Sequence, residues 1–178
     1  MTQEHDELDA AGWRRGADGM RERSAARVVL LDAAGRVLLV RGHDVDLPER
    51  SWWFTVGGGI DPGETPRGAA VREVREETGI ALDDAALVGP VGRRSAVFDF
   101  AREHCRQHEV FFVARLAGDT TLARDGWTAL EREVVDDVAW LTVAELRSAD
   151  VEVFPRELPD LVEALQDGWD GVEREIGT

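Results

Sequence analysis

Three glutamates close together in the sequence carry the clearest chemical signal in this chain. Glu73, Glu76 and Glu77 are spaced i, i+3 and i+4, so in a helix their carboxylates share one face about 100° wide. That face is locally unfavourable, because the charges repel one another and the last two meet the negative end of the helix dipole. A divalent cation would relieve the repulsion, and all-oxygen ligation suits Mg²⁺ or Mn²⁺. The alternative is a solvated charged helix face.

A glycine-rich loop precedes the segment that must hold these glutamates. Residues 57–63 contain four glycines and a proline, which exclude regular structure and allow a ligand to approach the backbone. Thr65 followed by Pro66 predicts a helix start with a hydroxyl cap. Gly79 predicts its end, because glycine readily adopts the left-handed conformation that closes a helix. The sequence therefore predicts a loop and a helix over residues 57–79.

The whole string resembles the signature of the Nudix hydrolase family, the Nudix box. Gly58 is followed after five residues by Glu64, and after seven more by Arg72-Glu73-Val74-x-Glu76-Glu77-x-Gly79-Ile80. The resemblance extends roughly from residue 27 to residue 146. It implies an α/β fold, an α/β/α sandwich with a mixed β-sheet and a catalytic loop and helix at Gly57–Gly79. It also implies metal-dependent attack of water on phosphorus in a nucleoside diphosphate derivative or a nucleoside triphosphate.

The resemblance further implies a role for each matching residue. Glu73, Glu76 and Glu77 would bind Mg²⁺ directly or through water, together with the carbonyl of Gly58, and Mn²⁺ could substitute. Glu73 and Glu76 would thereby be catalytic. Two other residues, Glu64 and Arg72, look like the pair that orients these carboxylates.

The general base varies within the family, so several candidates stay open. One is a glutamate of the box itself. Glu109 is slightly favoured, since it directly precedes the apolar run 110–113, where a carboxylate is costly unless it faces a polar pocket or a metal. Glu131 and Glu133 are the alternatives, although a solvated charged segment explains both without function.

Weaker hypotheses concern substrate binding. Five arginines fall near the expected mouth of the site and could grip phosphates with two hydrogen bonds each: Arg27, Arg41, Arg50, Arg93 and Arg94. Trp52 could stack on a base. A solvent salt bridge for each arginine, and core packing for the tryptophan, are the competing explanations. The residues do not decide which nucleotide derivative is hydrolysed or how many metal ions take part.

Length predicts a single domain with a core of its own. We expect this domain to span residues 23–170, after a mobile or loosely docked tail over residues 1–22 and before an acidic tail over residues 171–178. Expected strands cover residues 25–32, 37–41, 52–56, 85–91, 95–101, 109–116 and 134–140. Besides the helix of the box, helices are expected from Thr142, with Glu145 completing a capping box, and over residues 158–169.

Charge limits the classes of partner. The formal net charge is −15 and every basic residue is an arginine, which argues against duplex nucleic acid or an anionic membrane as the partner. An anionic small-molecule nucleotide must then be attracted locally. The single cysteine, Cys105, excludes an internal disulfide and suits a reducing cytoplasm. A homodimer is compatible with the sequence, and a nucleotide sensor of the same fold without turnover is the alternative function.

Overall fold

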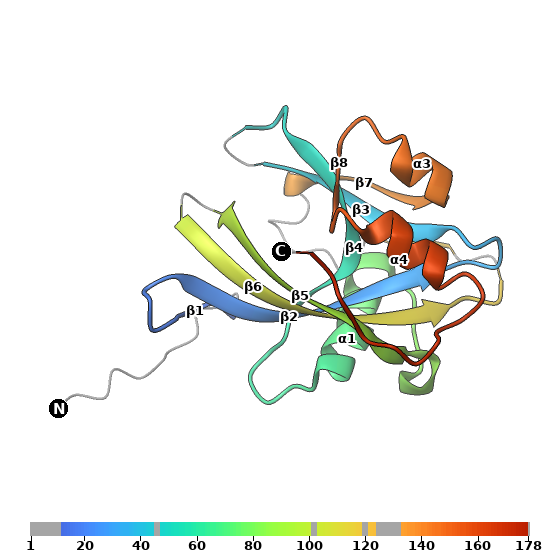
Figure 1. Ribbon diagram of the computed structural model, residues 1–178, viewed down its shortest axis with the longest axis horizontal. Helices are drawn as coiled ribbons and strands as arrows, with labels where there is room; N and C mark the ends of the chain where they lie inside the picture. The colour runs from blue at the N-terminus through green and yellow to red at the C-terminus, as the bar shows by residue number, and fades with distance from the viewer. Residues whose placement is uncertain (1–11, 45–46, 101–102, 119–120, 124–132, 178) are drawn as a thin grey trace.

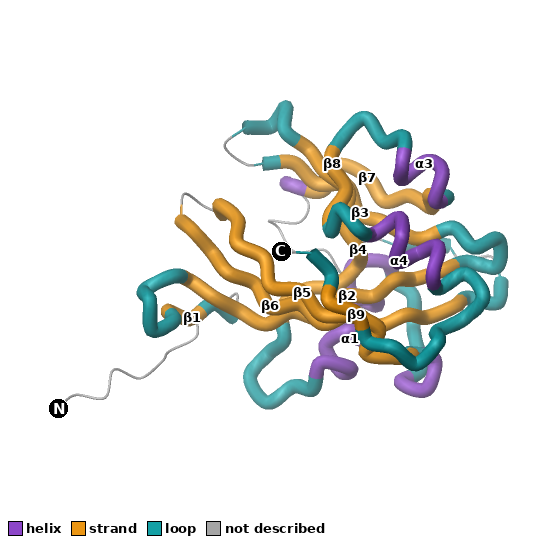
Figure 2. The backbone as a smooth tube through the Cα atoms, viewed as in Figure 1, coloured by secondary structure: helices purple, strands orange, loops and turns teal. Residues whose placement is uncertain are grey.

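A mixed sheet of nine strands forms the centre of the protein (Figure 2). The computed structural model describes residues 12–44, 47–100, 103–118, 121–123 and 133–177. The strand order is β7-β3-β4-β2-β6-β5-β9, with β1 paired to β2 and β8 paired to β4. Three pairs are parallel, namely β2–β6, β4–β8 and β5–β9. The strands are β1 Arg14–Arg15, β2 Arg21–Leu31, β3 Val37–His43, β4 Ser51–Gly59, β5 Val88–Phe100, β6 Glu103–Arg115, β7 Val135–Leu141, β8 Glu152–Phe154 and β9 Arg174–Glu175.

Helices cover both faces of this sheet (Figure 1). Helix α1, Pro66–Thr78, packs on one face, and the short helices α3, Val143–Arg147, and α4, Leu158–Ala164, pack on the other. A 3-10 turn, η1, spans Asp84–Ala86. The α/β/α sandwich with a mixed sheet expected from the sequence is confirmed. No helix within the described part of the chain is long and apolar enough to cross a membrane.

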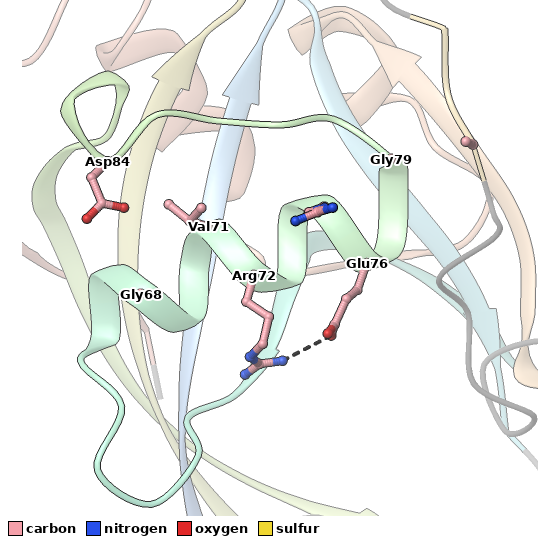
Figure 3. Close-up of a pocket in the computed structure, with 8 residues that line it drawn as sticks. Gly68, Val71, Arg72, Glu76, Gly79 and Asp84 are labelled. Carbon is pink, nitrogen blue, oxygen red and sulfur yellow. Dashed lines mark hydrogen bonds and ion pairs between the residues drawn. The ribbon is translucent and has the colours of Figure 1, made fainter.

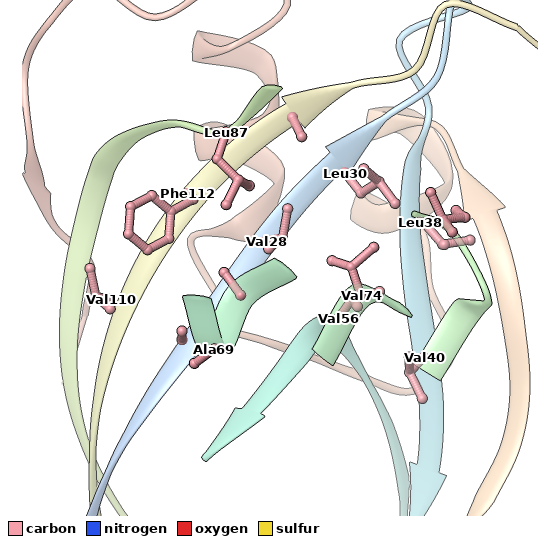
Figure 4. Close-up of a cluster of buried hydrophobic side chains, with 14 residues drawn as sticks. Val28, Leu30, Leu38, Val40, Val56, Ala69, Val74, Leu87, Val110 and Phe112 are labelled. Atoms are coloured by element: carbon pink, nitrogen blue, oxygen red, sulfur yellow. The ribbon is translucent and has the colours of Figure 1, made fainter. Parts of the chain in front are cut away.

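Strand β2 shows how the two cores arise from one run of apolar residues. Successive side chains of a strand point to opposite faces. Val28 and Leu30 therefore pack against Val74 of α1, while Val29 and Leu31 belong to the cluster beneath α3 and α4. All five side chains are fully buried, and Figure 4 shows the cluster on the α1 face. Because α1 is fixed on this core, its other face stays available for chemistry.

Both ends of α1 form as predicted. The Thr65 side chain accepts a hydrogen bond from the Gly68 amide, and Gly79 ends the helix with a φ of 75°. The capping box of Thr142 and Glu145 at the start of α3 is also confirmed. Helix α4 is shorter than predicted, because it ends at Ala164 rather than near residue 169.

The β5–β6 hairpin is longer than the sequence suggested. The segments predicted at 85–91 and 95–101 merge into one strand that begins only at Val88, with an irregularity between Val88 and Gly92, because residues 85 and 86 belong to η1. Residues 103–108, predicted as a loop, belong to β6. Because most of these residues are polar, the sequence did not indicate a strand here. The side chain of Gln107 is nevertheless buried, and its oxygen accepts a hydrogen bond from Arg23 of the neighbouring β2.

Both terminal segments contact the sheet. Trp13 is only 3% exposed, because its ring lies beside the guanidinium groups of Arg21 and Arg23 and meets the ring of Phe98 edge-on. Of the two alternatives for residues 1–22, a mobile or a loosely docked tail, these contacts favour a docked segment for residues 13–22, and residues 1–11 lie outside the described chain. At the other end β9 pairs with β5, and Ile176 is buried.

Candidate active site

Arg72 connects the glycine loop to the acidic face of α1. Its Nε and Nη2 atoms each donate to Glu64 at 3.0 Å, and Nη2 also donates to the Gly59 carbonyl at 2.8 Å. Its Nη1 donates to Glu73 at 2.8 Å and to Glu76 at 3.0 Å. Figure 3 shows the contact with Glu76 beside the depression along α1. The hydrogen bonds with Glu64 raise the pKa of Arg72, so its charge is permanent.

Glu73 is the buried member of the acidic face. It is 8% exposed, and burial raises the pKa of its carboxyl group although Arg72 lowers it. The carboxylate lies directly against Gly58: a Cβ atom at Gly58 would stand 2.7 Å from the carboxylate carbon and from both of its oxygens. This close approach gives a physical reason for glycine at the first position of the signature.

The other two glutamates differ in their surroundings. Glu77 accepts a hydrogen bond from the Gly57 amide at 2.8 Å, which binds the end of α1 to the glycine loop. The Glu76 side chain is 49% exposed. Within the described ranges no three His, Cys, Asp or Glu side chains already surround one metal-sized point. The donors are nevertheless hard oxygens on one helix face, which is the chemistry that Mg²⁺ requires.

Glu109, the favoured candidate for the base, has two arginine partners. Its Oε1 accepts from Arg27 Nε, its Oε2 accepts from Arg94 Nη1, both at 2.9 Å, and Gln107 Nε2 donates to Oε1 at 2.8 Å. Burial by itself raises the pKa of Glu109, but the charges of Arg27 and Arg94 bring it below its ordinary value. A lowered pKa makes a weaker base. The role of Glu109 as the general base stays a hypothesis, and its ion pairs with Arg27 and Arg94 argue against it.

Glu131 and Glu133 were the alternatives on the segment before the final strand. Glu133 is exposed, and Glu131 lies outside the described residues.

Arg27 joins Glu109 to the glycine loop. Its Nη1 donates to the carbonyl of Gly57 at 2.5 Å and to that of Thr55 at 3.2 Å, and its guanidinium carbon lies 5.7 Å from the centre of the Phe54 ring. Its positive charge also lowers the pKa of Glu73. Of the predicted substrate-binding residues, Arg27 is therefore the one in contact with the signature loop.

The remaining predicted residues lie on the strands around this centre. Arg41 lies over Trp53 and donates to Ser51, and its buried Nε has no partner among the described residues. Arg50 is exposed, lies over Trp52 and pairs with Glu152. The Trp52 ring meets the Phe154 ring edge-on, with 6.4 Å between the ring centres.

Arg93 differs from its neighbour Arg94. Its side chain is 59% exposed and pairs with Glu173, so the structure separates it from the site. Sequence reasoning missed Arg23, Gln107 and Phe154. The alternation of Arg21, Arg23 and Arg27 along β2 was the signal for Arg23, because residues two apart share a face.

Known proteins resemble this chain in sequence and in fold. The family model described as NUDIX domain matches residues 21–162. A putative 8-oxo-dGTP diphosphatase of Bacillus subtilis is 31% identical over 142 residues, which are 80% of this chain and 81% of that protein. An RNA pyrophosphohydrolase of Dinoroseobacter shibae is 46% identical over 66 residues, which are 37% of this chain and 39% of that protein.

Solved structures agree on the fold. The crystal structure of a MutT protein from Bacillus halodurans matches with a TM-score of 0.59 at 18% identity, covering 87% of this chain and 89% of that chain. A MutT protein from Methanosarcina mazei matches with a TM-score of 0.57 at 18% identity, covering 82% of this chain and 94% of that chain. Because the family model spans the loop, the helix and the surrounding sheet, this chain belongs to the Nudix hydrolase family.

Proposed function

We propose that this protein hydrolyses a pyrophosphate bond in a nucleoside triphosphate or a nucleoside diphosphate derivative, with a divalent cation and water. One observation carries the proposal: Arg72 gathers Glu64, Glu73 and Glu76 against the glycine loop. A fixed cation at the centre of three anions makes an acidic helix face into an ordered site. If the helix face were only solvated, its glutamates would not require a shared arginine.

The chemistry of a pyrophosphate explains what such a site must supply. The phosphate oxygens are negative and repel an incoming nucleophile. Mg²⁺, or Mn²⁺ in its place, would be held by Glu73, Glu76, Glu77 and the Gly58 carbonyl; when bound it supplies neutralising charge and lowers the pKa of water. The protein's own part is to orient these ligands through Arg72 and Glu64 and to keep Glu73 against the backbone of Gly58.

We propose that the base is one of two glutamates of the box. Glu73 lies against the glycine loop beside the other expected metal ligands, so a water molecule that the metal orients would lie close to it. Glu76 is exposed enough to reach a water molecule in the site. Glu109 fits this role less well because arginines hold both of its oxygens, whereas Arg72 contacts Oε1 of Glu73 and Oε2 of Glu76.

The class of substrate follows from the relatives and from charge. The relatives named above are described as a diphosphatase of 8-oxo-dGTP and as a pyrophosphohydrolase of RNA. We propose a nucleotide substrate for this chain as well, free in the cytoplasm. A net charge of −15 disfavours binding to duplex nucleic acid or to an anionic membrane.

A panel of substrates tests the proposal. Nucleoside triphosphates including 8-oxo-dGTP, a 5′-triphosphate RNA, ADP-ribose and nucleotide sugars would each be assayed with Mg²⁺, with Mn²⁺ and with EDTA. We expect turnover of at least one substrate only with metal, and incorporation of ¹⁸O from water into a phosphate product. The double substitution Glu73→Gln/Glu76→Gln should abolish turnover, whereas Glu175→Gln, at an exposed position on β9, should not. Binding without turnover across the panel would indicate a sensor instead.

A further inference from the structure

The N-terminal segment meets β2 at the point where the glycine loop leaves it. Strand β4 pairs with β2 up to Gly59, and the amide of Ile60 still donates to the carbonyl of Ser24 at 3.0 Å. Beyond that point β1 takes the same edge of β2, since β6 occupies the other edge throughout (Figure 1). A Cβ atom at Gly12 would stand 3.9 Å from the carbonyl oxygen of Ile60. The segment therefore runs directly beside the loop.

Trp13 docks this segment on the sheet. Its ring is 3% exposed, and the guanidinium carbons of Arg23 and Arg21 lie 4.5 Å and 5.3 Å from the ring centre. The ring of Phe98 on β5 meets it edge-on. Contacts between a cation and an aromatic ring are stronger where water is excluded. Burial also lowers the pKa of Arg23 to about 10, so this cation is held away from water and depends on its protein partners.

A chain of buried hydrogen bonds leads from Arg23 to the glycine loop. Arg23 Nε donates to Gln107 Oε1 at 2.6 Å, and Gln107 Nε2 donates to Glu109 Oε1 at 2.8 Å. The same oxygen of Glu109 accepts from Arg27 Nε at 2.9 Å, and Arg27 Nη1 donates to the carbonyl of Gly57. The Gln107 and Glu109 residues are 3% and 6% exposed. Hydrogen bonds shielded from water in this way are strong and hold their groups in one arrangement.

Gly57 connects this chain to the expected metal ligands. Its carbonyl accepts from Arg27, while its amide donates to Glu77 at 2.8 Å. A Cβ atom at Gly57 would overlap the backbone of β2, so the loop is pressed against that strand. Gly58 follows directly, and its backbone lies against the carboxylate of Glu73. A displacement of Gly57 would therefore disturb the surroundings of both glutamates.

The alternative is a buried network that only stabilises the sheet. Two features favour a part in positioning. Gln107 uses both ends of its amide on charged partners, although apolar side chains of similar volume are often as stable or more stable at sites that serve packing alone. The chain of hydrogen bonds also ends at Gly57, within the signature loop, rather than in the core.

We propose that the N-terminal segment is part of the proposed active site: Trp13 and Gln107 are positioning residues that fix Gly57, and with it the expected metal ligands of the box. Glu109 and Arg27 are the links between them. The inference rests on the proposed function and deepens it, because it adds to the site a segment that is distant from the box in the sequence. Neither positioning residue touches the reacting groups, and each acts by limiting the motion of the loop.

Hydrogen exchange of the metal-free, full-length protein tests the loop without any turnover. Gln107→Met keeps the approximate volume of the side chain and removes both of its hydrogen bonds. We expect the amides of residues 57–60 to exchange at least tenfold faster than in wild type. His104→Gln is the matched control on the same strand, because its side chain is exposed and pairs with Asp99. Leu161→Ala is the control for global stability, since it removes buried atoms from the core beneath α4. Loop exchange in both controls should stay within threefold of wild type.

Trp13 supplies a second set of variants at the edge of the protein, which decides the question even if Gln107→Met does not fold. Trp13→Ala should accelerate exchange of the same amides at least fivefold, whereas Trp13→Phe keeps a ring beside Arg23 and should stay within threefold of wild type. The double variant Trp13→Ala/Gln107→Met should exchange no faster than Gln107→Met alone, because both changes break one chain of contacts.

Three results of these exchange measurements would overturn the inference. Wild-type loop exchange in Gln107→Met or in Trp13→Ala would show that the chain does not hold Gly57. Equal acceleration in Leu161→Ala would reduce the effect to global stability. Effects that multiply in the double variant would mean that Trp13 and Gln107 act separately.

Magnesium binding and turnover then connect the loop to the site. We expect Mg²⁺ to bind Gln107→Met at least fivefold more weakly in calorimetry. With a nucleoside triphosphate, kcat should fall at least tenfold while KM stays within threefold, because the expected metal ligands are displaced but the substrate contacts are kept. Faster loop exchange with wild-type Mg²⁺ affinity and kcat would contradict the positioning role. If the wild type turns over no nucleotide, the proposed function fails, and loop exchange still decides whether the segment positions the loop.

Discussion

Gly58→Ala isolates the contact between the glycine loop and Glu73. The backbone of Gly58 is not in the left-handed region, so alanine is compatible with it. The added Cβ would stand 2.7 Å from all three atoms of the Glu73 carboxylate. Ordinary contact begins near 3.4 Å, so the carboxylate must retreat by about 0.7 Å, or lose its hydrogen bond with Arg72.

The displacement should affect activity far more than stability. Misplacing a catalytic group by about 1 Å costs on the order of a hundredfold in rate, equivalent to about 2.7 kcal/mol of transition-state stabilisation. We therefore expect kcat to fall about a hundredfold, with the free energy of unfolding changed by less than about 1 kcal/mol, because the glycine-to-alanine change also restricts the unfolded chain.

The assay combines metal-dependent turnover with denaturant unfolding of the same preparation. Gly118→Ala is the control, because among the described residues a Cβ there meets no atom within 4 Å. A kcat equal to wild type in Gly58→Ala would refute the reasoning, since Glu73 would then tolerate displacement. A loss of several kcal/mol in stability would show that the glycine serves folding rather than the position of Glu73.

Three further predictions concern metal and pH. Glu77→Gln should cut turnover at least about a hundredfold at saturating Mg²⁺. Its metal-free Tm should not fall, because a glutamine oxygen can still accept from the Gly57 amide while the repulsion among the three glutamates is reduced. A wild-type kcat in this variant would show that Glu77 does not belong to the site. Mg²⁺ or Mn²⁺ should stabilise the wild type by about 2.7 kcal/mol at a hundredfold excess over Kd, and this gain should vanish in the triple Gln variant of Glu73, Glu76 and Glu77; a persistent gain would place the metal elsewhere. Glu109→Gln should cost about 3 kcal/mol at neutral pH, because it leaves two buried arginines without a counter-charge. Because folding lowers the pKa of Glu109, its stabilising contribution is present above the ordinary value of 4.5 and is lost as pH falls through the folded-state pKa. The free energies of unfolding of wild type and Glu109→Gln should therefore converge in acid by up to about 1.4 kcal/mol per pH unit. A difference that stays constant with pH would show that the charge of the carboxylate does not stabilise the fold.

The sequence by itself determined the parts of this protein that depend on near neighbours in the chain. The start and end of α1 follow from Thr65 and Gly79, and the common face of Glu73, Glu76 and Glu77 follows from helical spacing alone. The resemblance to a known family fixed the fold and the class of reaction. The contacts among Glu64, Arg72 and Glu73 also join residues that one loop and one helix bring together.

Only the tertiary structure decided what surrounds Glu109. Its partner Arg27 lies 82 residues away in the chain, and Arg94 lies 15 residues away across a hairpin. Their meeting depends on the parallel register of β2 with β6 and on the antiparallel register of β5 with β6. A shift of one residue in either pairing would turn the arginine to the opposite face. The pattern of residue types along one strand does not contain that register, because it is set by how the whole sheet packs between α1 and the helices α3 and α4.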